Sequence, residues 1–259
     1  MAKQKIETDL QEELEQKYRA PALEKGLDIL ELLARHSDPL TSSQIATILG
    51  RSVSELFRMI MALEYRGYIM QVADGYALTN KLFTLGIAQG SAKTLLDASL
   101  SVMKELSNEI GQSCHLVVPS GDQIVVIARQ ESPMDLGFSV RVGYRRRLID
   151  TNSGALFFGL ASAEEQAQWL PHLSHSATSD EVQRFHLRAE AAVQKGYIQH
   201  PSDFVEGVMD FCMPICNRQG AVAVLIVPFI RIKAQTIPED KVIASLRLAT
   251  EKIAHDLID

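Results

Sequence analysis

Residues 40–78 constrain the fold of this chain more than any other stretch. The segment LTSSQIATILG predicts a short helix with a polar start, and RSVSELFRMIMALEYRGYI predicts a second helix. The apolar residues of the second helix recur at helical spacing, at Leu56, Met59, Ile60 and Leu63. The segment YIMQVADGYALT then alternates around a turn and predicts a hairpin. Two helices followed by a hairpin predict a winged helix-turn-helix, whose second helix can enter the DNA major groove.

The composition is that of a soluble globular protein. The chain has 259 residues, of which 46% are hydrophobic and 22% charged, enough for one large domain or two ordinary ones. No apolar run approaches the roughly 20 residues of a membrane span, so we expect no membrane partner. Residues 1–20 are polar, unlike a secretory signal. Three cysteines without a framework spacing favour reduced thiols and a cytoplasmic location.

The charge balance argues against a generic polyanion binder. The net charge is -6, and residues 19–93 hold eight basic side chains against seven acidic ones. Affinity for DNA must therefore come from local arrangement and from the pairing of subunits.

The sequence predicts an α+β protein with four parts. These are a mobile extension (1–20), the winged helix-turn-helix (21–78), a linker helix (79–94) and a second domain (95–259). In the second domain, strands are expected near 114–119, 123–130, 136–143, 196–200, 209–216 and 221–229. Helices are expected near 95–110, 152–161, 163–170, 179–195 and 238–258. Helices that flank a largely antiparallel sheet would give this domain an enclosed face.

The order of five motifs resembles that of bacterial transcription regulators of the IclR type (isocitrate lyase regulator). The motifs are ALEKGLDILELL, R-M-I-x-x-L-x-x-x-G-Y, Y-x-L-T-x-K-L-x-x-L-G, ESPMDLGFSVRVGYRRRL and T-x-S-G-A-L. The resemblance implies a winged helix joined by a helix to a GAF-like effector-binding domain, in a homodimer or homotetramer. It also implies a ligand-responsive regulator of a catabolic operon that binds a palindromic operator in double-stranded DNA.

Candidate DNA contacts lie on and before the second helix. Arg58 is expected to pair with guanine or phosphate, or else to be a solvated helix charge. Ser52 and Ser54 are expected to cap the helix, to meet DNA, or to do both, because a capped helix start can also face phosphate. Thr41 and Ser42 are mainly capping residues, with phosphate contact as a second role. Two positions depart from the family. Arg51 stands where leucine is usual, and Glu55 replaces a small hydroxyl residue. Glu55 either accepts a hydrogen bond from the N4 amino group of cytosine or forms an ion pair with Arg51 or Arg58.

The family binds a small organic acid between a sheet and a helix N-terminus. The matching helix start is Asn152-Ser153-Gly154-Ala155, where free N–H groups attract a carboxylate; the alternative is an ordinary capped helix. Carried over by position, the opposite wall comprises His200, Asp210, Val227 and Phe229, with Leu136 and Phe138 as further apolar wall. His200 would pair with a carboxylate and Asp210 would hold a hydroxyl, unless they are a loop residue and a strand-end cap.

Val227 and Phe229 are apolar at positions of the expected ligand wall, which favours an effector larger or more aromatic than a two- or three-carbon keto acid. Aromatic and sugar-derived acids are the expected classes.

The sequence contains no nucleophile elbow, phosphate loop or dinucleotide fingerprint, so no catalytic residue and no cofactor is assigned. Cys212 and Cys216 alone are too few for a metal site. A site that adds Cys114 and His115 is conceivable, but buried apolar cysteines are the favoured interpretation, so no metal is assigned. The alternatives are a sensor or partner-binding protein with weak or lost operator binding and, less favoured, an enzyme.

Overall fold

The structure is a computed structural model that describes residues 20–73, 75–88, 91–175, 177–218, 220–231 and 237–257. The chain divides into two compact units, Met1–Gly90 and Ser91–Asp259. The expectation of a mobile extension concerns residues 1–20, of which all but Ala20 lie outside the described residues, as does Asp74 at the predicted hairpin turn.

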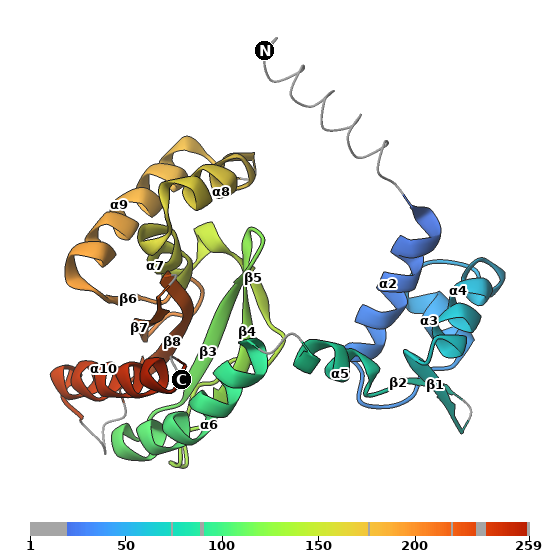
Figure 1. The fold of residues 1–259 in the computed structure, drawn as a ribbon, viewed down its shortest axis with the longest axis horizontal. Helices are drawn as coiled ribbons and strands as arrows, with labels where there is room; N and C mark the ends of the chain where they lie inside the picture. Colours follow the sequence, from blue (N-terminus) through green and yellow to red (C-terminus); the bar gives the residue numbers. More distant parts are fainter. Residues whose placement is uncertain are drawn as a thin grey trace, which may run out of the picture. The chain divides into compact units, whose positions relative to one another are not determined.

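The first unit is a winged helix-turn-helix, as the sequence predicts (Figure 1). Its elements are α2 (Pro21–Ala34), α3 (Ser42–Ile48), α4 (Val53–Tyr65), β1 (Ile69–Val72), β2 (Gly75–Leu78) and α5 (Lys81–Ala88). Strands β1 and β2 pair antiparallel, with Ile69 opposite Leu78. Within the segment predicted as a linker helix (79–94), α5 ends at Ala88 and the next helix begins at Ser91, and residues 89 and 90 lie outside the described residues.

Local capping fixes where the two central helices begin. Thr41 forms a capping box with Gln44, since its hydroxyl accepts from the Gln44 N–H and the Gln44 side chain accepts from the Thr41 N–H. The Ser52 hydroxyl accepts from the Glu55 N–H at 3.2 Å. The three helices and the hairpin then bury one core, which contains Ile29, Leu32, Leu33, Leu40, Ile45, Ala46, Leu56, Ile60 and Ile69.

The second unit is a three-layer α/β/α domain. Its elements are α6 (Ser91–Ile110), β3 (Cys114–Ser120), β4 (Gln123–Gln130), β5 (Arg145–Arg147), a 3₁₀ turn (Leu148–Asp150), α7 (Asn152–Leu160), α8 (Ala163–His175), α9 (Ser179–Lys195), β6 (Ile198–Pro201), β7 (Val208–Asn217), β8 (Gly220–Ile230) and α10 (Glu239–Asp256). The strands form one sheet in the order β5-β4-β3-β8-β7-β6, and every neighbouring pair is antiparallel.

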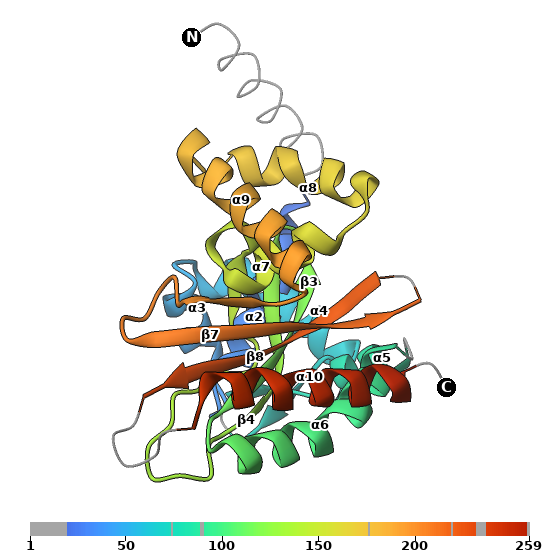
Figure 2. The ribbon, with the colours of Figure 1, turned by 90° about the vertical axis from the view of Figure 1, so that its left-hand side faces the viewer.

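Each face of the sheet carries its own core. Helices α6 and α10 cover one face, and α7 to α9 lie on the other side (Figure 2). Side chains alternate between the two faces along a strand. Accordingly, Phe211, Val227 and Phe229 pack in the core beneath α6 and α10, whereas Cys212 and Ile226 face α7. None of the described helices is long and apolar enough to cross a membrane.

The predicted strand at 136–143 is wrong. That segment contains no strand and ends in a turn, and the ladder with β4 is formed by Arg145–Arg147 instead. The left-handed Gly143 (φ 83°) turns the chain just before β5. The helix predicted at 163–170 also runs further, to His175, with Pro171 inside it.

Candidate functional site

The outward face of α4 combines polar and apolar side chains. Leu56 and Ile60 are buried in the core, so Ser54, Phe57, Arg58, Met61 and Tyr65 are left exposed on the other side of the helix. The Arg58 side chain makes no hydrogen bond or ion pair with the residues that the structure describes. Thr41 and Ser42 lie at the start of α3, where Thr41 is a capping residue.

Glu55 is held by two cations. Its Oε1 lies 2.6 Å from Lys25 Nζ on α2 and 3.1 Å from Arg51 Nη1. The hydrogen bond from Lys25 is the main reason why the pKa of Glu55 is lowered, so this carboxylate stays charged. Of the two roles expected for Glu55, pairing with Arg51 is present, and Lys25 is a partner that the sequence did not indicate. Ser54 lies 3.2 Å from Ser52, hydroxyl to hydroxyl.

The second unit encloses a cavity between its sheet and the start of α7. The apolar part of its lining consists of Ile124, Val126, Phe138, Val140, Phe204, Cys212, Ile226 and Pro228. The polar part consists of His115, Tyr144, Thr151, Asn152, Ser153 and Asp210. The volume open to the centres of water molecules is about 30 Å³, room for about two waters. A ligand larger than two waters therefore requires lining side chains to move.

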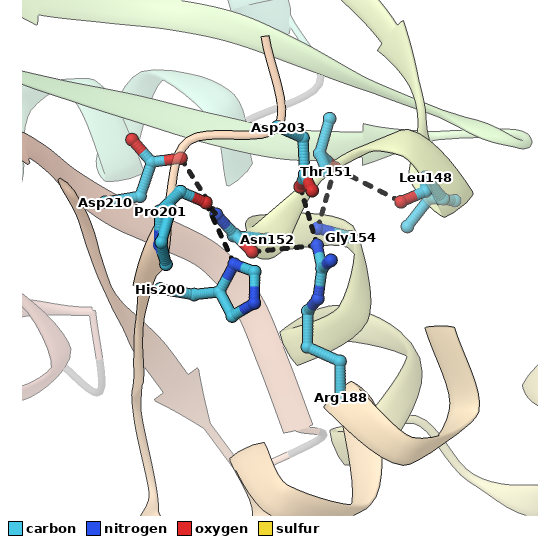
Figure 3. Close-up of polar contacts among 9 residues, drawn as sticks. All are labelled: Leu148, Thr151, Asn152, Gly154, Arg188, His200, Pro201, Asp203 and Asp210. Carbon is cyan, nitrogen blue, oxygen red and sulfur yellow. Dashed lines mark hydrogen bonds and ion pairs between the residues drawn. The ribbon is translucent and has the colours of Figure 1, made fainter. Parts of the chain in front are cut away.

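A polar network joins α7, α9 and the sheet at this cavity (Figure 3). The Asn152 amide donates to Asp210 Oδ2 at 3.0 Å and to the Pro201 carbonyl at 3.1 Å. Its oxygen accepts from Arg188 Nη1 at 2.9 Å, and the same nitrogen lies 2.6 Å from Asp203 Oδ2. Every hydrogen-bonding group of the Asn152 side chain is thereby engaged, so its orientation is fixed.

Burial changes the protonation of two groups that line the cavity. Desolvation raises the pKa of Asp210 to about 6, although the hydrogen bond from Asn152 opposes the shift. Desolvation also lowers the pKa of His115 to about 4, so its ring is neutral near pH 7. His115 Nδ1 is buried and has no hydrogen-bond partner among the described residues. An unpaired polar atom at a cavity wall is a group that a ligand or water can satisfy.

The start of α7 is both capped and tightly packed. Thr151 Oγ1 accepts from the Gly154 N–H at 3.0 Å, and the first intrahelical bond runs from Ala155 to the Thr151 carbonyl. The N–H groups of Asn152 and Ser153 precede that bond and donate to no group in the described part of the chain. Asn152 and Ser153 line the cavity, so this helix start combines unpaired donors with the positive end of the helix dipole.

The structure brings together four of the ten residues predicted to bind ligand. Phe138, Asn152, Ser153 and Asp210 line the cavity. Gly154 and Ala155 do not; a side chain at Gly154 would lie 2.0 Å from the Leu148 carbonyl oxygen, so this glycine serves backbone packing.

The other four residues lie elsewhere. Val227 and Phe229 point into the opposite core, and Ile226 and Pro228 take the wall assigned to them. Leu136 is 64% exposed and does not line the cavity. His200 pairs with Asp210 across the β6–β7 ladder, but it lies outside the lining and its ring contacts the Pro201 carbonyl.

Sequence reasoning missed several lining residues. The sequence indicates His115 only as a possible metal ligand, but it lies on the cavity face of β3, while the adjacent Cys114 belongs to the other core. Tyr144 and Phe204 come from loops, where no periodicity marks a face. The described residues contain no group of three or more side chains that could hold a metal ion.

Comparisons with known proteins match both units. The model of the IclR helix-turn-helix domain matches residues 22–73, and that of the bacterial transcriptional regulator IclR C-terminal domain matches residues 91–255. The HTH-type transcriptional regulator KdgR of Escherichia coli is 26% identical over 245 residues, covering 90% of this chain and 91% of that protein.

Two further relatives carry names that mention an aromatic compound. The p-hydroxybenzoate hydroxylase transcriptional activator of Acinetobacter baylyi is 23% identical over 208 residues, covering 76% of each chain. The solved structure of an IclR homologue from Microbacterium hydrocarbonoxydans, complexed with 4-hydroxybenzoate, superposes with a TM-score of 0.73 at 18% identity. It covers 91% of this chain and 98% of that one.

Proposed function

Because this chain belongs to the IclR family of bacterial transcriptional regulators, we propose that it controls a catabolic operon in response to a small aromatic hydroxy acid. The relatives are named as transcriptional regulators rather than enzymes. The observation that carries the choice of ligand is the cavity at α7, where apolar walls surround a few polar groups. That combination is typical of small-molecule sites.

The apolar walls favour a flat, partly aromatic ligand. Phe138 and Phe204 line the cavity together with Ile226 and Pro228, and none of these side chains can form a hydrogen bond with a hydroxyl group of a ligand. A sugar-derived acid carries a hydroxyl on most carbons and would leave several of them unpaired against these walls. The neighbour complexed with 4-hydroxybenzoate shares the fold, which supports the aromatic class.

The polar groups suggest how such a ligand is oriented. Its carboxylate would meet the unpaired N–H groups of Asn152 and Ser153 at the start of α7. Its hydroxyl would donate to Asp210 or bond to His115 Nδ1, which has no partner among the described residues. A carboxylate placed against Asp210 instead would be repelled by that carboxylate.

Ligand entry requires the cavity to open. Tyr144 and Phe204 line it and are both more than a third exposed, so they lie on its solvent side. Their rings are 6.3 Å apart, and the Arg146 guanidinium lies 4.9 Å from the centre of the Phe204 ring. Displacement of these side chains, which belong to loop and edge segments, is the proposed route of entry.

The DNA-binding part of the proposal rests on α3 and α4. Arg58, Ser54 and the exposed apolar residues of α4 would enter the major groove, while Thr41, Ser42 and Ser52 meet phosphates. With so little net positive charge in residues 19–93, we propose that two copies act together on a palindromic operator. The segment 79–94 would link the effector domain (95–259) to the winged helix (21–78).

A thermal-shift screen followed by a DNA-binding assay tests the proposal. 4-Hydroxybenzoate and its isomers, benzoate, glyoxylate and a sugar acid are added in turn to the full-length protein. We expect a hydroxybenzoate to raise the melting temperature most and to change binding to an operator fragment. Stabilisation by glyoxylate alone would contradict the ligand class, and failure to bind any DNA from its own promoter region would favour a sensor without operator binding.

A further inference from the structure

The outward face of α4 has a composition that phosphate contacts do not explain. Phe57 is 55% exposed, Met61 42% and Tyr65 90%, and they follow one another at a spacing of four residues. Residues four apart lie one above the other along a helix, so the three side chains form a continuous apolar strip. Val53, one turn before Phe57, extends the strip to the start of the helix and is also exposed.

The charges beside this strip favour DNA as the surface that covers it. Glu55 is the only acid in the first turn of α4, and Lys25 and Arg51 hold its carboxylate. Arg58, next to Phe57, is the one cation on the exposed face, and it makes no ion pair with any described residue. The exposed face therefore presents a positive charge beside apolar groups, which complements a groove lined by phosphates.

Within the major groove, one chemical group matches a phenyl ring. Thymine presents its 5-methyl group there, whereas the other features of base edges are hydrogen-bond donors and acceptors. Phenylalanine has no hydrogen-bonding group, so it gains only from contact with that methyl. The N-terminal part of a recognition helix approaches the base edges, and Phe57 is the fifth residue of α4.

We propose that Phe57, supported by Met61, contacts thymine methyl groups in each half of the operator and selects thymine at those positions. This inference rests on the proposed binding of α4 in the major groove and adds the bases that it prefers. Burying one methyl group contributes about as much as one CH₂, so each contact corresponds to about fourfold in affinity.

Replacing thymine by uracil tests the proposal, because it removes only the methyl group. A duplex is selected from a random library by the full-length protein, and each thymine is then replaced singly by uracil. For the wild-type protein, we expect uracil at specific thymine positions to weaken binding about fourfold. Phe57→Ala should bind the thymine and uracil duplexes equally well, whereas Phe57→Leu should still bind the uracil duplex more weakly. The control is Leu23→Ala, an exposed apolar residue of α2, which should keep the loss.

The outcomes distinguish failure of the thymine contact from failure of operator binding as such. Uracil-insensitive binding, or the same loss in wild type and Phe57→Ala, would overturn the assignment to thymine while leaving operator binding intact. Selection of no duplex at all would overturn the proposed function and this inference with it. Loss of dimerisation in Phe57→Ala, without a change in the uracil effect, would assign the strip to a second copy of the chain instead.

Discussion

The side-chain amide of Asn152 donates to Asp210 Oδ2 at 3.0 Å, which ties the first residue of α7 to β7 across the cavity. The oxygen of the same amide accepts from Arg188, which in turn pairs with Asp203. A ligand that displaces or strengthens the bond to Asp210 therefore also acts on α9 and on the segment that carries Phe204. This network offers a physical route from an occupied cavity to a rearranged domain.

The buried carboxyl of Asp210 predicts a particular dependence of stability on pH. Its pKa is about 6 in the folded protein, above its usual 3.8, so the folded state holds this proton more tightly than the unfolded state. The favourable contribution is therefore complete below about pH 4 and is lost as the pH rises through about 6. The loss amounts to at most about 3 kcal/mol, because a tenfold difference in proton affinity between the two states corresponds to about 1.4 kcal/mol.

Asp210→Asn removes this titration. We expect the free energy of unfolding of the variant, relative to wild type, to increase between about pH 4.5 and about pH 8. Urea denaturation at several pH values measures it. A constant difference between the two proteins across that range would show that Asp210 titrates normally.

Gly154 should tolerate no side chain even in the absence of ligand. A Cβ atom there would lie 2.0 Å from the Leu148 carbonyl oxygen, and this oxygen is backbone that cannot move aside freely. We expect Gly154→Ala to destabilise the second unit by several kcal/mol, about the cost of overpacking or more. Gly26→Ala is the control, since a Cβ atom meets nothing there within 4 Å. Equal urea midpoints for wild type and Gly154→Ala would contradict this packing.

Release of the cations around Glu55 should strengthen DNA binding. Glu55→Gln removes the carboxylate that pairs with Lys25 and with Arg51 at the start of α4, and leaves Arg51 only a longer ion pair with Asp28, at 3.9 Å. We expect higher affinity at low salt and a steeper dependence of log K on log salt concentration, by up to about two units. The matched control is Glu31→Gln, which breaks an exposed pair with Arg35 on α2. An unchanged salt slope in Glu55→Gln would place both cations away from phosphate.

Removal of the Phe204 ring should speed ligand exchange. The ring lines the cavity beside Tyr144 and lies under the Arg146 guanidinium. We expect Phe204→Ala to bind and release 4-hydroxybenzoate faster in stopped-flow experiments, because a closed cavity must open before a ligand enters. Leu136→Ala, an exposed residue outside the lining, should behave as wild type. Slower or unchanged exchange in Phe204→Ala would place the entry elsewhere.

The sequence predicted the fold well where patterns are distinctive. Helical spacing and caps such as Thr41 and Ser52 located α3 and α4, and the family motifs predicted the second unit. The cavity wall was harder, because β8 is apolar on both faces and its sequence does not distinguish Ile226 from Val227. Only the register of the sheet, which pairs Cys212 with Ile226 and Phe211 with Val227, settles which side faces α7.

Contacts between distant segments could not be predicted from the sequence for a different reason. Arg188 on α9 meets Asn152 on α7, and Lys25 on α2 meets Glu55 on α4. These residues are 36 and 30 positions apart, and no local periodicity relates them. The orientation of Asn152 and the ion pair between Glu55 and Lys25 can therefore be seen only in the folded chain.

Under the proposed function, a ligand in the cavity of the second unit controls DNA binding by the first. The most direct test measures the dissociation constant for the selected operator duplex by fluorescence anisotropy, with and without 4-hydroxybenzoate, for wild type and Asp210→Leu. We expect the ligand to change the wild-type constant at least about fivefold, the lower end of allosteric coupling, and to leave that of the variant unchanged. The same constant with and without a hydroxybenzoate that demonstrably binds the wild-type protein would contradict the account.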